Sequence, residues 1–245
     1  MPPNSENSNT DQGLYGFGYD DKIDDFKLVR VSEVHTPIDS SDGYEDEFVI
    51  QIFRSIPNSD EVEVSWVRSE SRVEIYTLGS NSWRTYECQD MPYYFYSGTK
   101  PEVVVNGALH WSADKKSEYY VAIVSFDMAN ETFKEVARLE GPMLHLVECD
   151  HHSIDSNSVA ALGGCICILH KTYGVKVDVW VMQEYGVKES WTKRFTITLK
   201  SITETSDLEV ICEFQNNEIL FYTDDGLVYY DPNHNLPLFN ANKPD

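Results

Sequence analysis

A short aromatic motif recurs along the chain at a nearly constant spacing. Each copy has an aromatic residue at the end of a β-like run, then an acidic or polar turn, then a second aromatic residue. The first aromatics are Tyr76, Phe126, Trp180 and Tyr230, separated by 50, 54 and 50 residues. A repeat of about 50 residues is typical of architectures in which each repeat buries its apolar surface only against its neighbours.

A second motif, a glycine- or asparagine-marked turn that runs into an apolar strand, interleaves with the first. Its copies cover residues 103–111, 161–170 and 213–222. Two interleaved motifs on one period predict a kelch-like β-propeller of antiparallel four-stranded sheets, one blade per repeat. No stretch has sustained helical periodicity, so we expect an all-β chain. Residues 13–240 are predicted to form this propeller-like domain, with 1–12 a disordered polar N-terminus and 241–245 a tail.

The aromatics of the first motif are the expected blade cores. Besides Tyr76, Phe126 and Trp180, these are the closing aromatics Trp83, Phe133 and Trp191. Five cysteines form no disulfide framework. Cys165 and Cys167 are two residues apart on a presumed strand, so they share a face, and we expect buried small hydrophobes rather than a disulfide.

The net charge of −22, from 41 acidic and 19 basic residues, is the second strong signal. The acids concentrate in residues 20–25, 39–47 and 60–63. Such a surface repels phosphate backbones, which argues against nucleic acid as a direct partner. It would speed encounter with a cationic protein, although the acid can equally serve to keep an aromatic-rich β-protein soluble.

No membrane segment is expected. Residues 1–13 are polar, and the most apolar stretch, 162–169, is too short to cross a bilayer. We therefore expect a cytoplasmic protein with no membrane association.

Catalytic and metal chemistry have weak support. The best metal candidate, Glu148 to His152, lacks a second set of ligands at a spacing typical of zinc sites, so we interpret it as a solvated loop. His110 and His170 end equivalent strands of the second motif, as structural residues do. No nucleophile elbow, phosphate loop or metalloprotease motif is present. The sequence predicts a non-catalytic chain without cofactor or metal.

Partner binding is predicted at two segments. The acidic loop would steer a basic protein toward the chain, through Asp39, Asp42, Glu45, Asp46 and Glu47. The aromatic stretch at 92–101 cannot turn all its rings to one core. It is either a contact surface that supplies specificity through Tyr93, Tyr94 and Tyr96, or a loop packed over a neighbouring blade.

The repeat string resembles the plant F-box-associated propeller domain. The matching segments run in the family's order and include GLYGFGYDDKIDDFKLVRVSEV (13–34), VEIYTLGSNSWRTYE (73–87) and VVVNGALHW (103–111), followed by residues 123–142, 162–171 and 177–197. Within that family the chain is most similar to the S-locus F-box proteins of pollen, through the first segment and the acidity. This resemblance implies a substrate-recognition module of a cullin-based ubiquitin ligase that captures non-self S-ribonucleases, which are basic proteins, in gametophytic self-incompatibility.

The chain departs from the family in lacking the leucine-rich F-box segment of the type LPxDxxxxILxxLP and the strand that usually follows the last block. We therefore expect a fragment or truncated variant with an incomplete propeller, which engages the ligase scaffold only if an F-box lies upstream. Three alternatives stay open: an F-box-associated domain with an unrelated protein target, a sugar-binding or enzymatic propeller, and a truncated product without a ligand.

Overall fold

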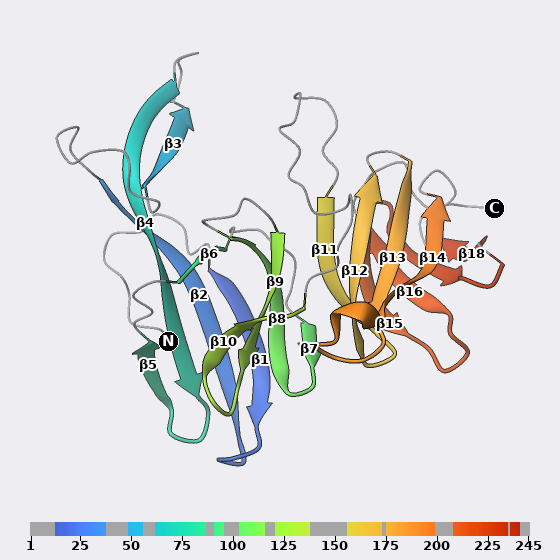
Figure 1. Cartoon of the computed structure of the whole chain (residues 1–245), viewed down its shortest axis with the longest axis horizontal. Helices are drawn as coiled ribbons and strands as arrows, with labels where there is room; N and C mark the ends of the chain where they lie inside the picture. The colour runs from blue at the N-terminus through green and yellow to red at the C-terminus, as the bar shows by residue number, and fades with distance from the viewer. Residues whose placement is uncertain are drawn as a thin grey trace. The chain divides into compact units, whose positions relative to one another are not determined.

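The structure, a computed structural model, describes residues 13–37, 49–55, 62–86, 91–95, 103–115, 121–137, 156–172, 175–198, 208–234 and 236–240. The chain forms two compact units. Unit one comprises Met1–Pro101 with Ala113–Tyr119, and unit two comprises Glu102–Ser112 with Tyr120–Asp245. The predicted disordered segment 1–12 and tail 241–245 lie outside the described residues. Figure 1 shows the strands coloured along the chain.

Sheet 1 belongs to unit one and has the strand order β1-β2-β4-β3, with β5 pairing β4. Its strands are β1 (Leu14–Asp20), β2 (Asp25–Pro37), β3 (Val49–Ser55), β4 (Val62–Thr77) and β5 (Ser82–Tyr86). Every pairing is antiparallel. The hairpin of β1 and β2 is the one that the aromatic alternation of residues 13–34 indicates.

Sheet 2 has the order β10-β9-β8-β6, with β7 pairing β8. Its strands are β6 (Tyr93–Tyr94), β7 (Val103–Val105), β8 (Ala108–Lys115), β9 (Val121–Asp127) and β10 (Thr132–Glu135). The last residues of β8, from Ala113, belong with β6 to unit one, and the other strands belong to unit two.

Sheets 3 and 4 lie in unit two, and each is a four-stranded antiparallel meander in chain order. Sheet 3 consists of β11 (Ser156–Leu162), β12 (Cys165–Thr172), β13 (Lys176–Met182) and β14 (Trp191–Thr198), with the 3₁₀ turn η2 (Lys188–Ser190) before β14. Sheet 4 consists of β15 (Leu208–Glu213), β16 (Ile219–Thr223), β17 (Gly226–Asp231) and β18 (Leu236–Asn240).

The turns of the second motif have the geometry that their residues favour. Asn106 and Gly107 join β7 to β8 with φ of 50° and 72°, and Gly163 and Gly164 join β11 to β12 with φ of 57° and 76°. Two consecutive residues with positive φ make the tight turn that matches the twist of a hairpin. The all-β class and the antiparallel blade-type sheets that the repeat predicts are confirmed.

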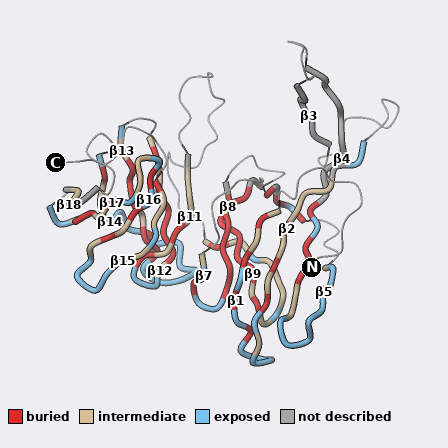
Figure 2. The backbone as a smooth tube through the Cα atoms, turned by 180° about the vertical axis from the view of Figure 1, so that it is seen from behind, coloured by how far each residue is buried: buried red, intermediate tan, exposed pale blue. Residues whose placement is uncertain are grey.

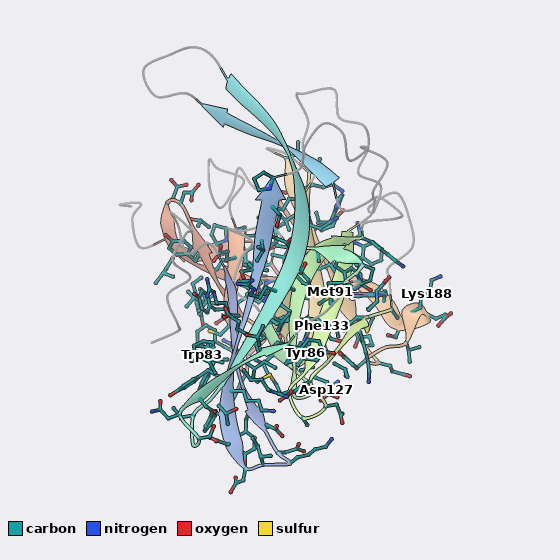
Figure 3. All side chains as sticks on the ribbon, turned by 90° about the vertical axis from the view of Figure 1, so that its left-hand side faces the viewer. Trp83, Tyr86, Met91, Asp127, Phe133 and Lys188 are labelled. Carbon is teal, nitrogen blue, oxygen red and sulfur yellow. The ribbon has the colours of Figure 1, made fainter. Side chains whose placement is uncertain are left out.

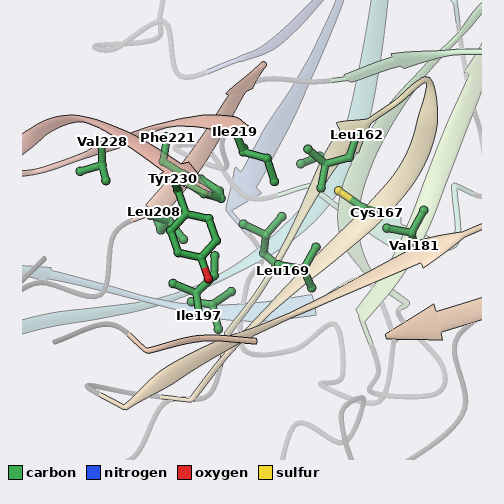
Figure 4. Packing of buried hydrophobic residues seen from close by; sticks show 13 residues of the cluster. Leu162, Cys167, Leu169, Val181, Ile197, Leu208, Ile219, Phe221, Val228 and Tyr230 are labelled. Atoms are coloured by element: carbon green, nitrogen blue, oxygen red, sulfur yellow. The ribbon is translucent and has the colours of Figure 1, made fainter. Parts of the chain in front are cut away.

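The core of unit two follows strand alternation along β12. Ile166 and Ile168 pack with residues of sheet 2, including Val105 and Ile123. Cys167 and Leu169 point to the opposite face and pack against sheet 4. Figure 4 shows this second cluster, in which Phe221 and Tyr230 lie with Leu169 and Ile197. Because sheet 3 is covered on both faces, its strands are apolar at consecutive positions, which is typical of fully buried strands.

The prediction of buried cysteines is confirmed for Cys167, whereas Cys165 is only partly buried. Cys167 is fully buried, and Cys165 packs against the same cluster. Both are free thiols, as is Cys212.

The prediction that all the repeat aromatics are buried is wrong in part. Phe126 and Trp191 are buried, but Tyr76, Trp83, Phe133 and Trp180 are only partly buried. Trp83 and Phe133, labelled in Figure 3, lie on β5 and β10, which each pair with one neighbouring strand only. Their rings pack at a tilt against cross-strand partners, Trp83 against Tyr76 at 5.2 Å and Phe133 against Phe126 at 4.8 Å between centroids. The edge position of these strands leaves part of each ring exposed.

Candidate functional site

The residues predicted to bind a partner fall mostly beyond the described part of the chain. Asp39, Asp42, Glu45, Asp46, Glu47 and Tyr96 lie outside the described residues. Tyr94 is on β6, opposite Asp114 of β8, but the structure describes only its backbone. Tyr93 is the one candidate with a described side chain.

Tyr93 is a packing residue rather than an accessible contact. Its side chain is 7% exposed, and its ring meets the edge of the buried Phe95 at 6.5 Å between centroids. The backbone around it is also held, because Glu33 accepts hydrogen bonds from the Ser71 hydroxyl at 2.8 Å and the Phe95 amide at 3.4 Å. For Tyr93 the structure therefore favours the second of the two alternatives, a segment packed on its neighbours.

The β1–β2 hairpin instead carries an exposed aromatic cluster. Phe17, Tyr19 and Phe26 are 51%, 44% and 42% exposed. Phe17 and Phe26 stack with centroids 5.3 Å apart and planes at 3°, and Tyr19 meets Phe26 edge-on at 5.2 Å. Ile23 and Leu78, each 52% exposed, belong to the adjacent turns. We call these five residues the hairpin surface; the end of the hairpin is pale blue in Figure 2.

The sequence of β1 explains why the aromatics point outward. Gly16 and Gly18 alternate with the aromatics, and both are buried on the inner face together with Leu14 and Asp20. Because glycine has no side chain, the buried face of β1 lets another segment of the protein approach closely. The large aromatic side chains therefore occupy the opposite, exposed face. Sequence reasoning recognised the hairpin but missed its exposed surface. The alternation of glycine with aromatics is the signal that could have found it.

A buried ion pair fixes the inner face of the hairpin. Lys27 Nζ lies 2.5 Å from Asp20 Oδ2, and the two side chains are 5% and 1% exposed. Burial by itself raises the pKa of Asp20, but the hydrogen bonds from Lys27 and from the Lys22 amide outweigh it and leave the pKa below its ordinary value. Because unpairing either buried charge costs several kcal/mol, the hairpin holds its register and its aromatic face.

The turn between β4 and β5 is tied to the end of this hairpin. Asp25 Oδ2 accepts the Gly79 amide at 2.8 Å, and the Leu78 amide donates to the Phe26 carbonyl at 3.0 Å. A Cβ added at Gly79 would lie 2.5 Å from Asp25 Oδ2. A β-carbon would fit here only if the Asp25 side chain turned away, and the paired turns bring Leu78 beside the aromatic cluster.

Carboxylates lie beside the hairpin surface. Asp21, Asp24 and Asp25 stand in or beside the turn, against Lys22, whereas Asp20 and Lys27 pair with each other on the inner face. The Tyr19 hydroxyl donates to Asp24, and this hydrogen bond raises the pKa of Tyr19. Exposed ring faces beside carboxylates suit a cationic ligand, because the negative face of an aromatic ring attracts ammonium and guanidinium groups. The arrangement can bind and orient a basic side chain.

The histidines of the second motif have structural partners. His110 is 1% exposed, and its Nε2 lies 2.7 Å from the Tyr185 hydroxyl and its Nδ1 3.3 Å from the Val103 carbonyl. Burial lowers the pKa of His110 despite its hydrogen bonds. Nδ1 of His170 lies 2.9 Å from Asn157 Oδ1.

Neither a metal site nor a membrane span emerges from the described residues. Across those residues, no three histidine, cysteine, aspartate or glutamate side chains gather as a metal site would need. The predicted ligand-rich stretch Glu148 to His152 falls outside them. Within the same residues, no helix has the length and apolarity to cross a membrane.

Known proteins share the sequence pattern of this chain. It is 29% identical to F-box protein At3g07870 of Arabidopsis thaliana over 94% of this chain and 55% of that protein. It is 28% identical to F-box protein CPR1, over 85% and 49%, and 24% identical to F-box/kelch-repeat protein At3g23880, over 91% and 51%, both of the same plant. The chain thus spans about half the length of these relatives.

A protein-family match covers most of the chain. The model of the F-box associated beta propeller domain matches residues 3–229. The match includes all four sheets except the end of β17 and strand β18. This protein belongs to the F-box associated beta propeller domain family.

Proposed function

We propose that this chain is the substrate-recognition module of a cullin-based, SCF-type ubiquitin ligase. Its substrate is a basic protein, and the resemblance to S-locus F-box proteins favours a non-self S-ribonuclease captured in the pollen cytoplasm. The observation that carries the proposal is the hairpin surface, an exposed aromatic cluster beside carboxylates in a chain of net charge −22. The chain acts by binding and supplies no catalytic group.

The charge and the rings would contribute at different stages. Exposed carboxylates act over about a Debye length, roughly 8 Å at physiological ionic strength, and raise the rate of encounter with a cationic partner. The acidic loop at residues 39–47 would supply much of this attraction. Packed aromatic side chains then slow dissociation, because a few such anchors carry most of the binding energy of an interface.

The link to the ligase rests on the family. The relatives above are F-box proteins by name, and the present chain covers about half of each. We assign ligase docking to no residue of this chain. Contact with the ligase scaffold would come through an F-box joined to it.

The test is binding of the full chain to purified non-self S-ribonucleases, with an unrelated basic ribonuclease as a control for charge alone. The variant Phe17→Ser/Phe26→Ser removes two exposed rings. The matched control Val175→Ser removes an apolar side chain of similar exposure, 55%, from unit two.

The double variant should weaken binding by roughly tenfold or more, and the control should bind like the parent. Equal binding by the parent and the double variant would remove the hairpin surface from the proposal. If the parent binds no S-ribonuclease above the level of the basic control, the substrate is wrong, and the alternative of an unrelated protein target takes its place.

A further inference from the structure

The outer surface of sheet 4 is apolar although no described strand packs on it. Along β16 and β17, Ile219, Phe221 and Val228 point inward and are fully buried. Tyr222 and Leu227 are register partners on the opposite face, and they are 48% and 43% exposed. Sheet 3, by contrast, has apolar clusters on both of its faces.

Two further exposed apolar side chains of sheet 4 lie in β15 and directly after it. Ile211 is 54% exposed, at the point where the register between β15 and β16 shifts. Phe214 is 40% exposed, and its ring lies 5.1 Å from that of Tyr229. We define the sheet 4 surface as Ile211, Phe214, Tyr222 and Leu227. Exposed apolar side chains gathered on one sheet mark interaction sites more often than isolated ones do.

The charged side chains of sheet 4, apart from histidine, are all acidic. Residues 208–240 contain no lysine or arginine, and their acids are Glu209, Glu213, Glu218, Asp224, Asp225 and Asp231. Glu213 pairs with Arg194 of β14, and Asp231 pairs with His234. In sheet 1 the carboxylates alternate with Lys22, Lys27 and Arg30. Sheet 4 is therefore the more uniformly acidic of the two apolar surfaces.

The negative charge of sheet 4 favours a basic partner over a second copy of this chain. In a symmetric contact between two copies, the same patch would meet itself, so acid would face acid in a chain that already carries −22. Like charges brought together at an interface are unfavourable by several kcal/mol. A partner with apolar side chains rimmed by lysine or arginine would match both the apolar surface and its acidic surroundings.

We propose that the sheet 4 surface is a second docking site, which binds an apolar protein segment flanked by basic side chains. Tyr222 and Leu227 form its centre, and the acids beside them are Glu209, the register partner of Tyr222, and the exposed Asp224 of the turn between β16 and β17. This site lies in unit two and is independent of the hairpin surface in unit one. It does not depend on the identity of the ligase substrate.

The probe is a labelled amphipathic peptide with tryptophan and leucine along one face and lysines beside that face. Its binding to the full chain is followed by fluorescence anisotropy at low and high salt. A peptide with glutamate in place of lysine tests the charge. The variant Tyr222→Ser/Leu227→Ser is compared with Phe17→Ser/Phe26→Ser, which removes equally exposed rings from the hairpin surface.

We expect the lysine peptide to bind, the glutamate peptide to bind at least tenfold more weakly, and salt to reduce the difference. The sheet 4 variant should lose roughly tenfold in affinity, whereas the hairpin variant should bind like the parent. Both variants alter exposed side chains, and unchanged urea midpoints verify their folding. Equal affinity of the sheet 4 variant and the parent overturns the proposal, as does failure of the lysine peptide to bind. Dimerisation that Tyr222→Ser/Leu227→Ser abolishes also overturns it, since the occupant is then a second copy.

Discussion

The indole nitrogen of Trp191 lies 2.9 Å from the carbonyl oxygen of Ala137, to which it donates a hydrogen bond. Trp191 opens β14 of sheet 3, whereas Ala137 follows β10 of sheet 2. Its ring is 7% exposed within the cluster that joins these sheets. The closing aromatic of one repeat thus donates a hydrogen bond to a backbone carbonyl of the preceding repeat. Contacts of this kind are expected where each repeat is stabilised by its neighbours.

Replacing this indole should destabilise the fold more than replacing another one on the same sheet. Trp191→Phe keeps an aromatic ring but leaves the Ala137 carbonyl without this donor, and we expect a loss of about 1–3 kcal/mol in the free energy of unfolding in urea. The control is Trp180→Phe, because the Trp180 indole N–H has no hydrogen-bond partner among the residues that the structure describes. The control should lose about 1 kcal/mol less. Equal losses would show that the hydrogen bond contributes nothing.

The sequence predicts the antiparallel sheets better than it predicts which of the repeat aromatics are buried. The spacing of Tyr76 and Phe126 indicates equivalent hairpins because strand pairing is local and turn residues specify it. A register shift at Val179/Trp180 breaks this equivalence in sheet 3, where Trp180 faces Lys193 and Trp191 faces Met182. Such an irregularity, and the exposure of a strand at a sheet edge, depend on neighbours that a motif does not contain.

At the candidate site, too, the strands follow from the local sequence, whereas the burial of side chains depends on residues that are distant in sequence. The alternation of residues in β1 predicts which side chains share a face of the strand. It does not predict which of the two faces is covered by other segments of the protein. The burial of Tyr93 depends on Phe95 and on chain far away in sequence, such as Ser71. The aromatic stretch at 92–101 could not reveal this, because local composition is similar for packed and exposed rings.

Stability should fall in acid partly through Asp178. Burial alone raises the pKa of this carboxyl, but hydrogen bonds from Lys176, Thr196 and Lys193 lower it to about 2. A folded-state pKa below the unfolded value gives stability that is present above about pH 4 and lost as the pH falls toward 2. Asp178→Asn should therefore lower the free energy of unfolding at neutral pH by about 1–2 kcal/mol. It should also flatten the decline between pH 4 and 2.

Removing any acid also relieves repulsion in this strongly negative chain, so a control for net charge is needed. Asp224→Asn removes one exposed charge from a turn of sheet 4 and should not reproduce the loss. Urea unfolding across the pH range separates the two effects. A parent and an Asp178→Asn variant with parallel pH profiles would contradict the role of Asp178.

The thiol of Cys167 should be the slowest of the described cysteines to react. It is fully buried, and burial raises its pKa well above the ordinary value. Because the thiolate is the reactive species, alkylation in the native state should label Cys165 and Cys212 first and reach Cys167 only upon unfolding. Peptide mapping by mass spectrometry after timed exposure to iodoacetamide measures this order. Labelling of Cys167 as fast as Cys212 would mean that sheets 3 and 4 separate readily.

The contact between Asp25 and Gly79 can be tested by a double-mutant cycle. Gly79→Ala places a methyl group 2.5 Å from the carboxylate oxygen, so the Asp25 side chain must turn away and lose its hydrogen bond, which should destabilise the fold by about 1 kcal/mol. Asp25→Ala removes the obstacle as well as the hydrogen bond. The double variant should therefore lose less stability than the sum of the two single variants. Additive losses would show that the two turns do not act on each other.

The acidic loop at residues 39–47 should raise the rate at which a basic partner binds. Asp39, Asp42 and Asp46 are changed to Asn, and Glu45 and Glu47 to Gln, which removes five negative charges. Exposed charges are worth little as individual ion pairs, but together they attract a cationic protein from a distance. Association with a cationic S-ribonuclease should therefore slow and lose much of its salt dependence, while dissociation changes far less.

The control variant Glu184→Gln/Glu189→Gln neutralises two exposed acids of unit two. Stopped-flow measurements over a range of salt concentrations give the association rate per charge removed. If only net charge matters, the two variants lose the same amount per charge, and the acidic loop has no special role in steering. A larger loss per charge in the loop variant, greatest at low salt, identifies residues 39–47 as the segment that guides the partner. An association rate equal to the parent's at low salt would leave the loop with solubility as its only contribution.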